Sequence, residues 1–281
     1  MNSDEVRAYY ASFGDREWQR LEWAEGVVEF AVTTEMLARH LPSSGHVLDI
    51  GGGPGRYTEW LAQRGYRVTL ADLSPELLDI ARSRLRARDP SDPLPGAVEA
   101  IVEADARDLS QWPDDAFDAI LCLGPMYHLP DPHDREHAMT ELARVLRPGG
   151  TAFIAFMPWL IHVRRTVVVP DERRHLADPE FVASLRDRGE FRNDVPGRFT
   201  GGYGVRPDEV VPFIEPYGFA TCALVSTHGY ATGIEEELIA MRTSDPDAYA
   251  VAMRLLLETM GDASILGTAG HLLYIGDRIE A

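Results

Sequence analysis

Carboxylates and glycines that alternate along a short stretch are the first feature of this chain with a chemical use. Asp49, Gly51, Gly53 and Gly55 form an acidic-x-Gly-x-Gly-x-Gly pattern, and a further carboxylate, Asp72, stands downstream. Glycines lack a Cβ, so a backbone rich in them can turn tightly and approach a ligand. A carboxylate placed as Asp72 is can accept hydrogen bonds from the hydroxyls of a ribose. These residue types together predict a site for a ligand that contains a nucleoside.

The elements that must position these residues are two strands and the helix between them. The apolar run Val47–Ile50 is typical of a buried parallel strand. Residues 56–64 have a helical pattern that stops at Gly65, and a second short strand over residues 67–71 runs directly into Asp72. In a doubly wound sheet, the carboxyl ends of such strands face one ligand crevice, so the glycine turn and Asp72 are expected to meet there.

The spacing of the glycines separates two families of nucleotide sites. The dinucleotide fingerprint requires glycine at its first, third and sixth positions, but counting from Gly51 the sixth is Arg56, and counting from Gly52 the third is Pro54. The pattern that ends at Gly55 instead resembles the first motif of the class I S-adenosylmethionine (SAM) dependent methyltransferases. The resemblance implies an α/β fold with a doubly wound, mostly parallel seven-stranded sheet whose last strand is antiparallel. It also implies SAM as the cofactor, with S-adenosylhomocysteine as its product.

The same resemblance implies where further cofactor residues lie. A third strand, Val98–Glu103, precedes Asp105, which in this family would bond the amino group of adenine. Asp108 competes for that role, and a helix cap is the alternative interpretation of either aspartate. The expected cofactor residues come from the glycine turn, the strand ends and the N-terminal segment, and they are Asp49, Gly51, Gly53, Gly55, Asp72, Leu73, Asp105, Ala106, Leu123 and Tyr10.

The segment after the fourth strand, Phe117–Leu123, holds the residues expected nearest the transferred methyl group. Tyr127 and His128 follow this strand, at the edge where ligands of such sheets bind. His128 is the candidate general base because an imidazole titrates near neutrality. A cap on the following helix, or packing beneath the cofactor, is the alternative role for His128. We expect Tyr127 to contact the methyl acceptor.

The rest of the chain is expected to complete the sheet and to cover the site. Residues 1–44 predict an N-terminal helical lid, 45–157 the SAM-binding core, 158–205 a cap inserted after the fifth strand, and 206–281 the remainder of the sheet. Aromatic side chains of the lid suit a sulfonium cation, and Tyr9 is a candidate substrate contact. The cap is rich in arginine; most of these are expected to pair with surface acids, and Arg164 is a candidate ligand for a carboxylate or phosphate of the substrate.

Composition excludes several classes of function. The net charge is −18 and every one of the 27 basic residues is arginine, so a lysine base or Schiff base is excluded and nucleic acid is a poor expected partner. Cys122 and Cys222 lie in apolar runs and are expected to be buried thiols. His133 and His137 imitate metal spacing, but without a third ligand we predict no metal. We expect a cytoplasmic protein without a membrane segment.

The sequence therefore predicts a SAM-dependent methyltransferase that acts on an oxygen, nitrogen or carbon of a small molecule, in specialised metabolism by analogy of fold. A nicotinamide-dependent oxidoreductase, a methyltransferase of RNA or protein, and a non-catalytic SAM-binding subunit are the alternatives. The oligomeric state, monomer or homodimer, stays open.

Overall fold

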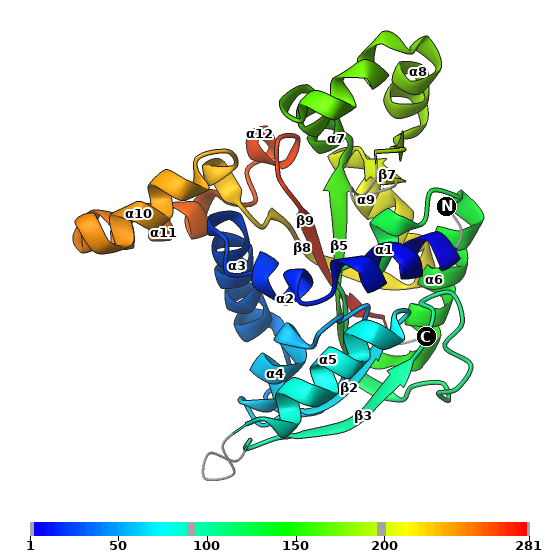
Figure 1. Ribbon diagram of the computed structural model, residues 1–281. Coiled ribbons are helices and arrows are strands. Elements are labelled where there is room, and N and C mark those ends of the chain that lie inside the picture. Colours follow the sequence, from blue (N-terminus) through cyan, green and yellow to red (C-terminus); the bar gives the residue numbers. More distant parts are fainter. Residues whose placement is uncertain (1–2, 89–93, 196–200, 280–281) are drawn as a thin grey trace.

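A mixed seven-stranded sheet forms the centre of the computed structural model, which describes residues 3–88, 94–195 and 201–279 (Figure 1). The strands run in the order β3-β2-β1-β4-β5-β9-β8, and β9 is antiparallel to both of its neighbours. The predicted sheet and its antiparallel last strand are thus confirmed. The strands of this sheet are β1 (His46–Ile50), β2 (Arg67–Asp72), β3 (Ala97–Glu103), β4 (Phe117–Cys122), β5 (Leu146–Pro158), β8 (Phe219–Ser226) and β9 (Leu272–Arg278).

Helices cover both faces of the sheet, because neighbouring residues of a buried strand point to opposite faces. In β1, Leu48 belongs to the core beneath α6 and α9, whereas Val47 belongs to the core beneath α3 and α4. The helices are α1 (Ser3–Phe13), α2 (Arg16–Arg20), α3 (Ala24–His40), α4 (Arg56–Ala62), α5 (Pro75–Arg86), α6 (Pro132–Val145), α7 (Trp159–Val168), α8 (Pro179–Arg188), α9 (Pro207–Ile214), α10 (Glu235–Ser244), α11 (Pro246–Thr259) and α12 (Ala263–Leu266). Four short 3₁₀ helices are η1 (Pro125–His128), η2 (Pro170–Ala177), η3 (Glu215–Tyr217) and η4 (Gly229–Ala231).

The segment after β5 contains a hairpin that the sequence pattern did not predict. Strands β6 (Glu190–Arg192) and β7 (Gly201–Val205) pair antiparallel, and β7 continues parallel to Met157 and Pro158 at the end of β5. Both strands are short and lack a clear alternation, so period-2 patterning could not reveal them. Residues 196–200 of this segment lie outside the described part. Helices α7 and α8 form most of the rest, and the segment projects beyond the carboxyl end of β5 (Figure 1).

The N-terminal helices are fastened across the carboxyl ends of the first strands. Arg7 of α1 forms an ion pair with Glu103 at the end of β3. Trp18 of α2 lies between two guanidinium groups, with the Arg56 carbon 4.6 Å and the Arg84 carbon 4.1 Å from its ring centroid. Such cation–π contacts attach α2 to α4 and α5 through side chains alone.

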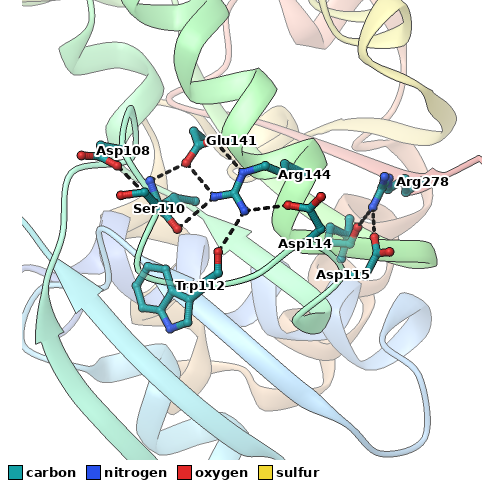
Figure 2. Close-up of polar contacts among 10 residues, drawn as sticks. Asp108, Ser110, Trp112, Asp114, Asp115, Glu141, Arg144 and Arg278 are labelled. Atoms are coloured by element: carbon teal, nitrogen blue, oxygen red, sulfur yellow. Dashed lines mark hydrogen bonds and ion pairs between the residues drawn. The ribbon is translucent and has the colours of Figure 1, made fainter.

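A polar cluster fixes the loop between β3 and β4 (Figure 2). The Arg144 guanidinium forms two hydrogen bonds of 2.8 Å to the Glu141 carboxylate, and it donates to the Trp112 carbonyl oxygen at 2.9 Å. In the same cluster, the Ser110 N–H donates to the Asp108 carboxylate at 3.1 Å. The loop that carries Asp105 is therefore anchored to Glu141 and Arg144 of α6.

One of the two cysteines departs from expectation. Cys122 is buried in β4, but Cys222 in β8 is exposed. The pairing of β8 with β9 shifts register between Thr221 and Ala223, so a bulge at Cys222 interrupts the alternation of the strand. Separately, no helix among the described residues is long and apolar enough to cross a membrane.

Candidate active site

A cavity lies at the carboxyl ends of β1, β2 and β4, beneath α1 and α2, and most of the predicted residues line it. The predicted residues that line the cavity are Asp49, Gly51, Gly53, Asp72, Leu73, Asp105, Ala106, Leu123, Tyr10, Tyr127 and His128. Gly55, Tyr9 and Arg164 were predicted as site residues but lie outside its lining. Most of the residues predicted by the switch-point rule therefore meet at one cavity.

The glycines of the turn after β1 differ in what they do. Gly51 has φ +72°, and a Cβ built there would lie 2.6 Å from the Pro125 ring, so the turn and η1 are in close contact. Gly53 has φ +55° and faces the cavity. Gly55, with φ +84°, instead caps the N-terminus of α4, where an added Cβ would meet Leu70 of β2 at 3.3 Å and Ala81 of α5 at 3.5 Å. Its role in this structure is helix packing rather than contact with the cavity.

The two acidic residues of the first two strands are both buried, and hydrogen bonds hold each of them in place. Asp72 accepts hydrogen bonds from the N–H groups of Gly53 and Ser74, each at 2.8 Å. The Thr58 hydroxyl donates to Asp49 at 2.7 Å and ties it to α4. Burial raises the pKa of each carboxyl to about 6. Asp72 keeps further lone pairs at the cavity wall, where a ligand hydroxyl could donate to them.

Asp105 is held by an arginine that the sequence did not single out. Arg107 donates to the two Asp105 oxygens, from Nε at 3.0 Å and from Nη2 at 2.6 Å, and its Nη1 reaches Asp134 at 2.9 Å. Both Asp105 and Arg107 line the cavity, whereas Asp108 is exposed and caps its own turn. The geometry thus favours Asp105 over Asp108 as the third cofactor carboxylate.

A histidine and a tyrosine meet at the far side of the cavity. The Tyr10 hydroxyl lies 2.8 Å from Nε2 of His128, and both side chains line the cavity. Burial lowers the pKa of His128 to about 3 and raises the pKa of Tyr10 well above its usual value. The pair is therefore uncharged at neutral pH. The ring of Tyr127 stands 4.9 Å from that of His128 and closes the same wall.

Three charged residues of the lid and α3 also line the cavity, and sequence analysis missed all three. Arg20 donates to Glu17 from Nε at 3.0 Å and to Glu29 from Nη1 at 2.9 Å. Burial opposes ionisation of Glu29, but the positive charges of Arg20 and His271 outweigh it and lower the pKa of Glu29 well below its usual value. A buried row of alternating charge suits the zwitterionic end of an amino acid. No local pattern singles these residues out, because Arg20 and Glu29 lie on different helices and meet only when α2 packs against α3.

The remaining predicted substrate residues lie apart from the cavity. Tyr9 stacks on Phe13, with ring centroids 5.5 Å apart, and the Arg164 guanidinium donates to the Thr268 carbonyl at 3.2 Å. Most cap arginines were expected to pair on the surface, but Arg165 forms an ion pair at 2.9 Å with Glu172, which is fully buried. His133 pairs with Glu136 at 3.2 Å, and the described residues contain no group of three or more side chains arranged to hold a metal ion.

Comparisons with known proteins agree with this arrangement. Residues 48–154 match the methyltransferase domain family. The chain is 41% identical over 127 residues to methyltransferase GfsG of Streptomyces halstedii, a match that covers 43% of this chain and only 42% of that protein. It is 31% identical over 185 residues to the ubiquinone biosynthesis O-methyltransferase of Xylella fastidiosa, which covers 59% of this chain and 69% of that enzyme.

The fold is shared with a solved SAM-dependent methyltransferase of Methanosarcina mazei, with a TM-score of 0.62 and 19% identity over 88% of this chain and 98% of that one. The chain belongs to the class I SAM-dependent methyltransferases, and SAM is its cofactor.

Proposed function

We propose that this enzyme transfers the methyl group of SAM to an oxygen or nitrogen of a small molecule. The observation that carries the proposal is the uncharged Tyr10–His128 pair, which is buried in the same cavity as the glycine turn and Asp72. A covered cavity favours a small acceptor over a polymer, and the net charge of −18 disfavours nucleic acid. The similarity to an O-methyltransferase favours oxygen as the methylated atom.

The residues of the cavity fit the three parts of the cofactor. The glycine turn leaves space for close approach of a ligand to the backbone, Asp72 offers acceptor oxygens for the ribose hydroxyls, and Asp105 offers them for the adenine amino group. Arg20, flanked by Glu17 and Glu29, offers opposite charges to the carboxylate and ammonium of the amino-acid end. Bound SAM supplies an electrophilic methyl group on a sulfonium.

The protein's own part in the reaction is to orient, to dehydrate and to move a proton. The lid helices hold the cavity closed, which excludes water and fixes the acceptor for an in-line displacement. His128 is uncharged across the physiological range, so its imidazole can take up the acceptor's proton through the Tyr10 hydroxyl, which lies 2.8 Å from Nε2. Its low pKa makes it a weak base, which suits an acceptor that loses its proton as the methyl group arrives.

Two measurements test the proposal. Calorimetric titration should show that S-adenosylhomocysteine binds with a dissociation constant in the micromolar range, which corresponds to a binding free energy of about −8 kcal/mol. NADH should not bind. The enzyme is then incubated with methyl-labelled SAM and a panel of small phenols, catechols, alcohols and amines. Label in an O- or N-methylated product supports the proposal. Label found only in added RNA or protein would overturn it, and cofactor binding with no transfer to any acceptor would favour a non-catalytic subunit.

A further inference from the structure

A buried arginine outside the active site lacks an acidic partner. Arg135 of α6 is only 8% exposed, and within the described residues it forms no ion pair. Burial lowers the pKa of its guanidinium, and the more distant carboxylates of Asp131 and Glu190 offset this only in part. Burying a cation without a partner is unfavourable by several kcal/mol, so such a group calls for an anion.

The hydrogen bonds of Arg135 occupy one edge of its guanidinium and leave the other free. Nη1 donates to the carbonyl oxygens of Leu129 at 2.6 Å and Pro130 at 2.7 Å. Nε and Nη2 donate to no described residue, and neither nitrogen is sealed from solvent. These two nitrogens share the edge of the guanidinium that binds a carboxylate or phosphate with two parallel hydrogen bonds. The Tyr203 ring lies 3.6 Å from the guanidinium carbon and holds it in place.

Arg135 lines a groove of about 340 Å³ that also has residues of β7 and α9 in its lining and shares no lining residue with the cofactor cavity. A second guanidinium, that of Arg206, lies 5.0 Å from the ring centroid of Trp159 in the same groove. The rings of Trp159 and Tyr203 and the guanidinium groups of Arg135 and Arg206 are thus among the side chains that line one groove.

The carboxylates that line this groove are already engaged. Asp187 binds Arg186 through two hydrogen bonds of 2.6 and 2.8 Å. Glu209 accepts from the backbone N–H of Arg206 at 3.2 Å and lies 4.0 Å from Nε of the same arginine, and Glu136 lies 3.2 Å from His133. The nearby acids therefore have other partners, and none of them forms an ion pair with Arg135 among the described residues.

We infer that this groove binds an oxyanion, a carboxylate or a phosphate group, through the Nε–Nη2 edge of Arg135. Arg206, whose Nε lies 4.0 Å from Glu209, brings a second guanidinium to the groove, and the rings of Trp159 and Tyr203 can pack against an aromatic group that carries the anion. The site is distinct from the cofactor cavity, and the inference does not depend on the proposed reaction.

The test observes the arginine nitrogen directly. The Nε–H signals of ¹⁵N-labelled protein are recorded by NMR, and the signal missing from the Arg135→Lys spectrum is that of Arg135. The native protein is then titrated separately with sodium phosphate and with sodium benzoate, at constant ionic strength maintained by sodium chloride. The Arg135 signal should shift along a saturable curve in at least one titration, with a dissociation constant on the order of 1 mM. The arm that saturates distinguishes phosphate from an aromatic carboxylate.

The controls separate a built site from general attraction of anions. Arg254 of α11 is exposed and serves as the matched residue, with Arg254→Lys used to assign its signal. Arg135→Lys keeps the charge but loses the two-pronged edge, so calorimetry should show at least about tenfold weaker binding of the preferred anion. If Arg135→Lys does not fold, Arg135→Gln supplies the assignment. The inference would be overturned if the chemical shift of the Arg135 signal does not change. It would also be overturned if this shift changes without saturation and in parallel with that of Arg254, which would mean an adventitious ion only.

Discussion

The backbone N–H of Gly53 donates to the carboxylate of Asp72 at 2.8 Å, so the turn after β1 and the end of β2 are joined by the same group that is proposed to hold the cofactor. The Ser74 N–H donates to the other oxygen of Asp72 at 2.8 Å. Each oxygen therefore has one protein donor and retains a lone pair for a ribose hydroxyl. The carboxylate is pre-oriented and need not reorganise when the cofactor binds.

Replacing Asp72 by Asn should weaken binding of S-adenosylhomocysteine by about 10- to 100-fold, because an amide has one acceptor oxygen instead of two and would set its NH₂ against an N–H donor. Asp79→Asn, on the exposed side of α5, is the matched control and should leave the affinity unchanged. Calorimetry with both variants measures the difference. Equal affinities of the two variants would remove Asp72 from the cofactor site.

Cofactor affinity should also depend on pH through Asp72. Burial raises the pKa of its carboxyl to about 6, and only the ionised form accepts from both ribose hydroxyls. Affinity for S-adenosylhomocysteine should therefore fall about tenfold from pH 7 to pH 5, as expected for uptake of one proton. This pH dependence of the affinity should be absent in Asp72→Asn. A slope that persists in this variant would assign the titration to another group.

Asp49 should affect stability rather than binding. Its pKa is raised to about 6 in the folded protein by burial, from an ordinary value of 3.8, so its contribution to stability is full below pH 3.8 and is lost as the pH rises through 6. Relative to Asp49→Asn, the native protein should lose about 2 kcal/mol of unfolding free energy between pH 4 and pH 8. Urea denaturation of both proteins across this range measures the change, and parallel curves would contradict it.

Local patterns predicted the parts of the site that come from single segments. The glycine turn, Asp72 and His128 could be found because each follows directly from an apolar strand. Arg20 and Glu29 could not, since they belong to different helices and become a buried pair only when α2 packs against α3. Arg107 was missed for a different reason, because its spacing to Asp105 resembles an ordinary surface pair. The β6–β7 hairpin was missed because both strands are short and lack a clear alternation.

Arg20 offers a test that separates the two ends of the cofactor. Arg20→Met should weaken binding of S-adenosylhomocysteine about tenfold or more, because the carboxylate of its amino-acid end loses a charged partner. Binding of 5′-methylthioadenosine, which lacks that end, should change far less. Arg39→Met, an exposed position of α3, should alter neither affinity. An equal loss for both ligands in Arg20→Met would indicate a structural role for the arginine.

His128 should contribute to the rate of transfer rather than to cofactor binding. With an acceptor from the panel, His128→Asn should reduce kcat by about 10²- to 10⁴-fold, the range of a general base, and leave the affinity for S-adenosylhomocysteine unchanged. Because burial lowers the pKa of His128 to about 3, its protonation should add no acidic limb to the rate between pH 5 and pH 7. His133→Asn, an exposed position, is the control. An unchanged kcat would assign His128 to packing against Tyr10.

Gly51 and Gly65 form a matched pair for testing how tightly the turn is built. Both have positive φ, +72° and +90°, a conformation unfavourable for residues with a Cβ by about 1–2 kcal/mol. A Cβ at Gly65 meets nothing within 4 Å, whereas one at Gly51 would lie 2.6 Å from the ring of Pro125. Gly65→Ala should therefore lose only the unfolding free energy that the positive φ costs a residue with a Cβ. It should bind S-adenosylhomocysteine normally. Gly51→Ala should lose more unfolding free energy in urea and also cofactor affinity, because η1 must move and carries His128 with it. Equal effects of the two substitutions would show that the turn can give way without disturbing η1.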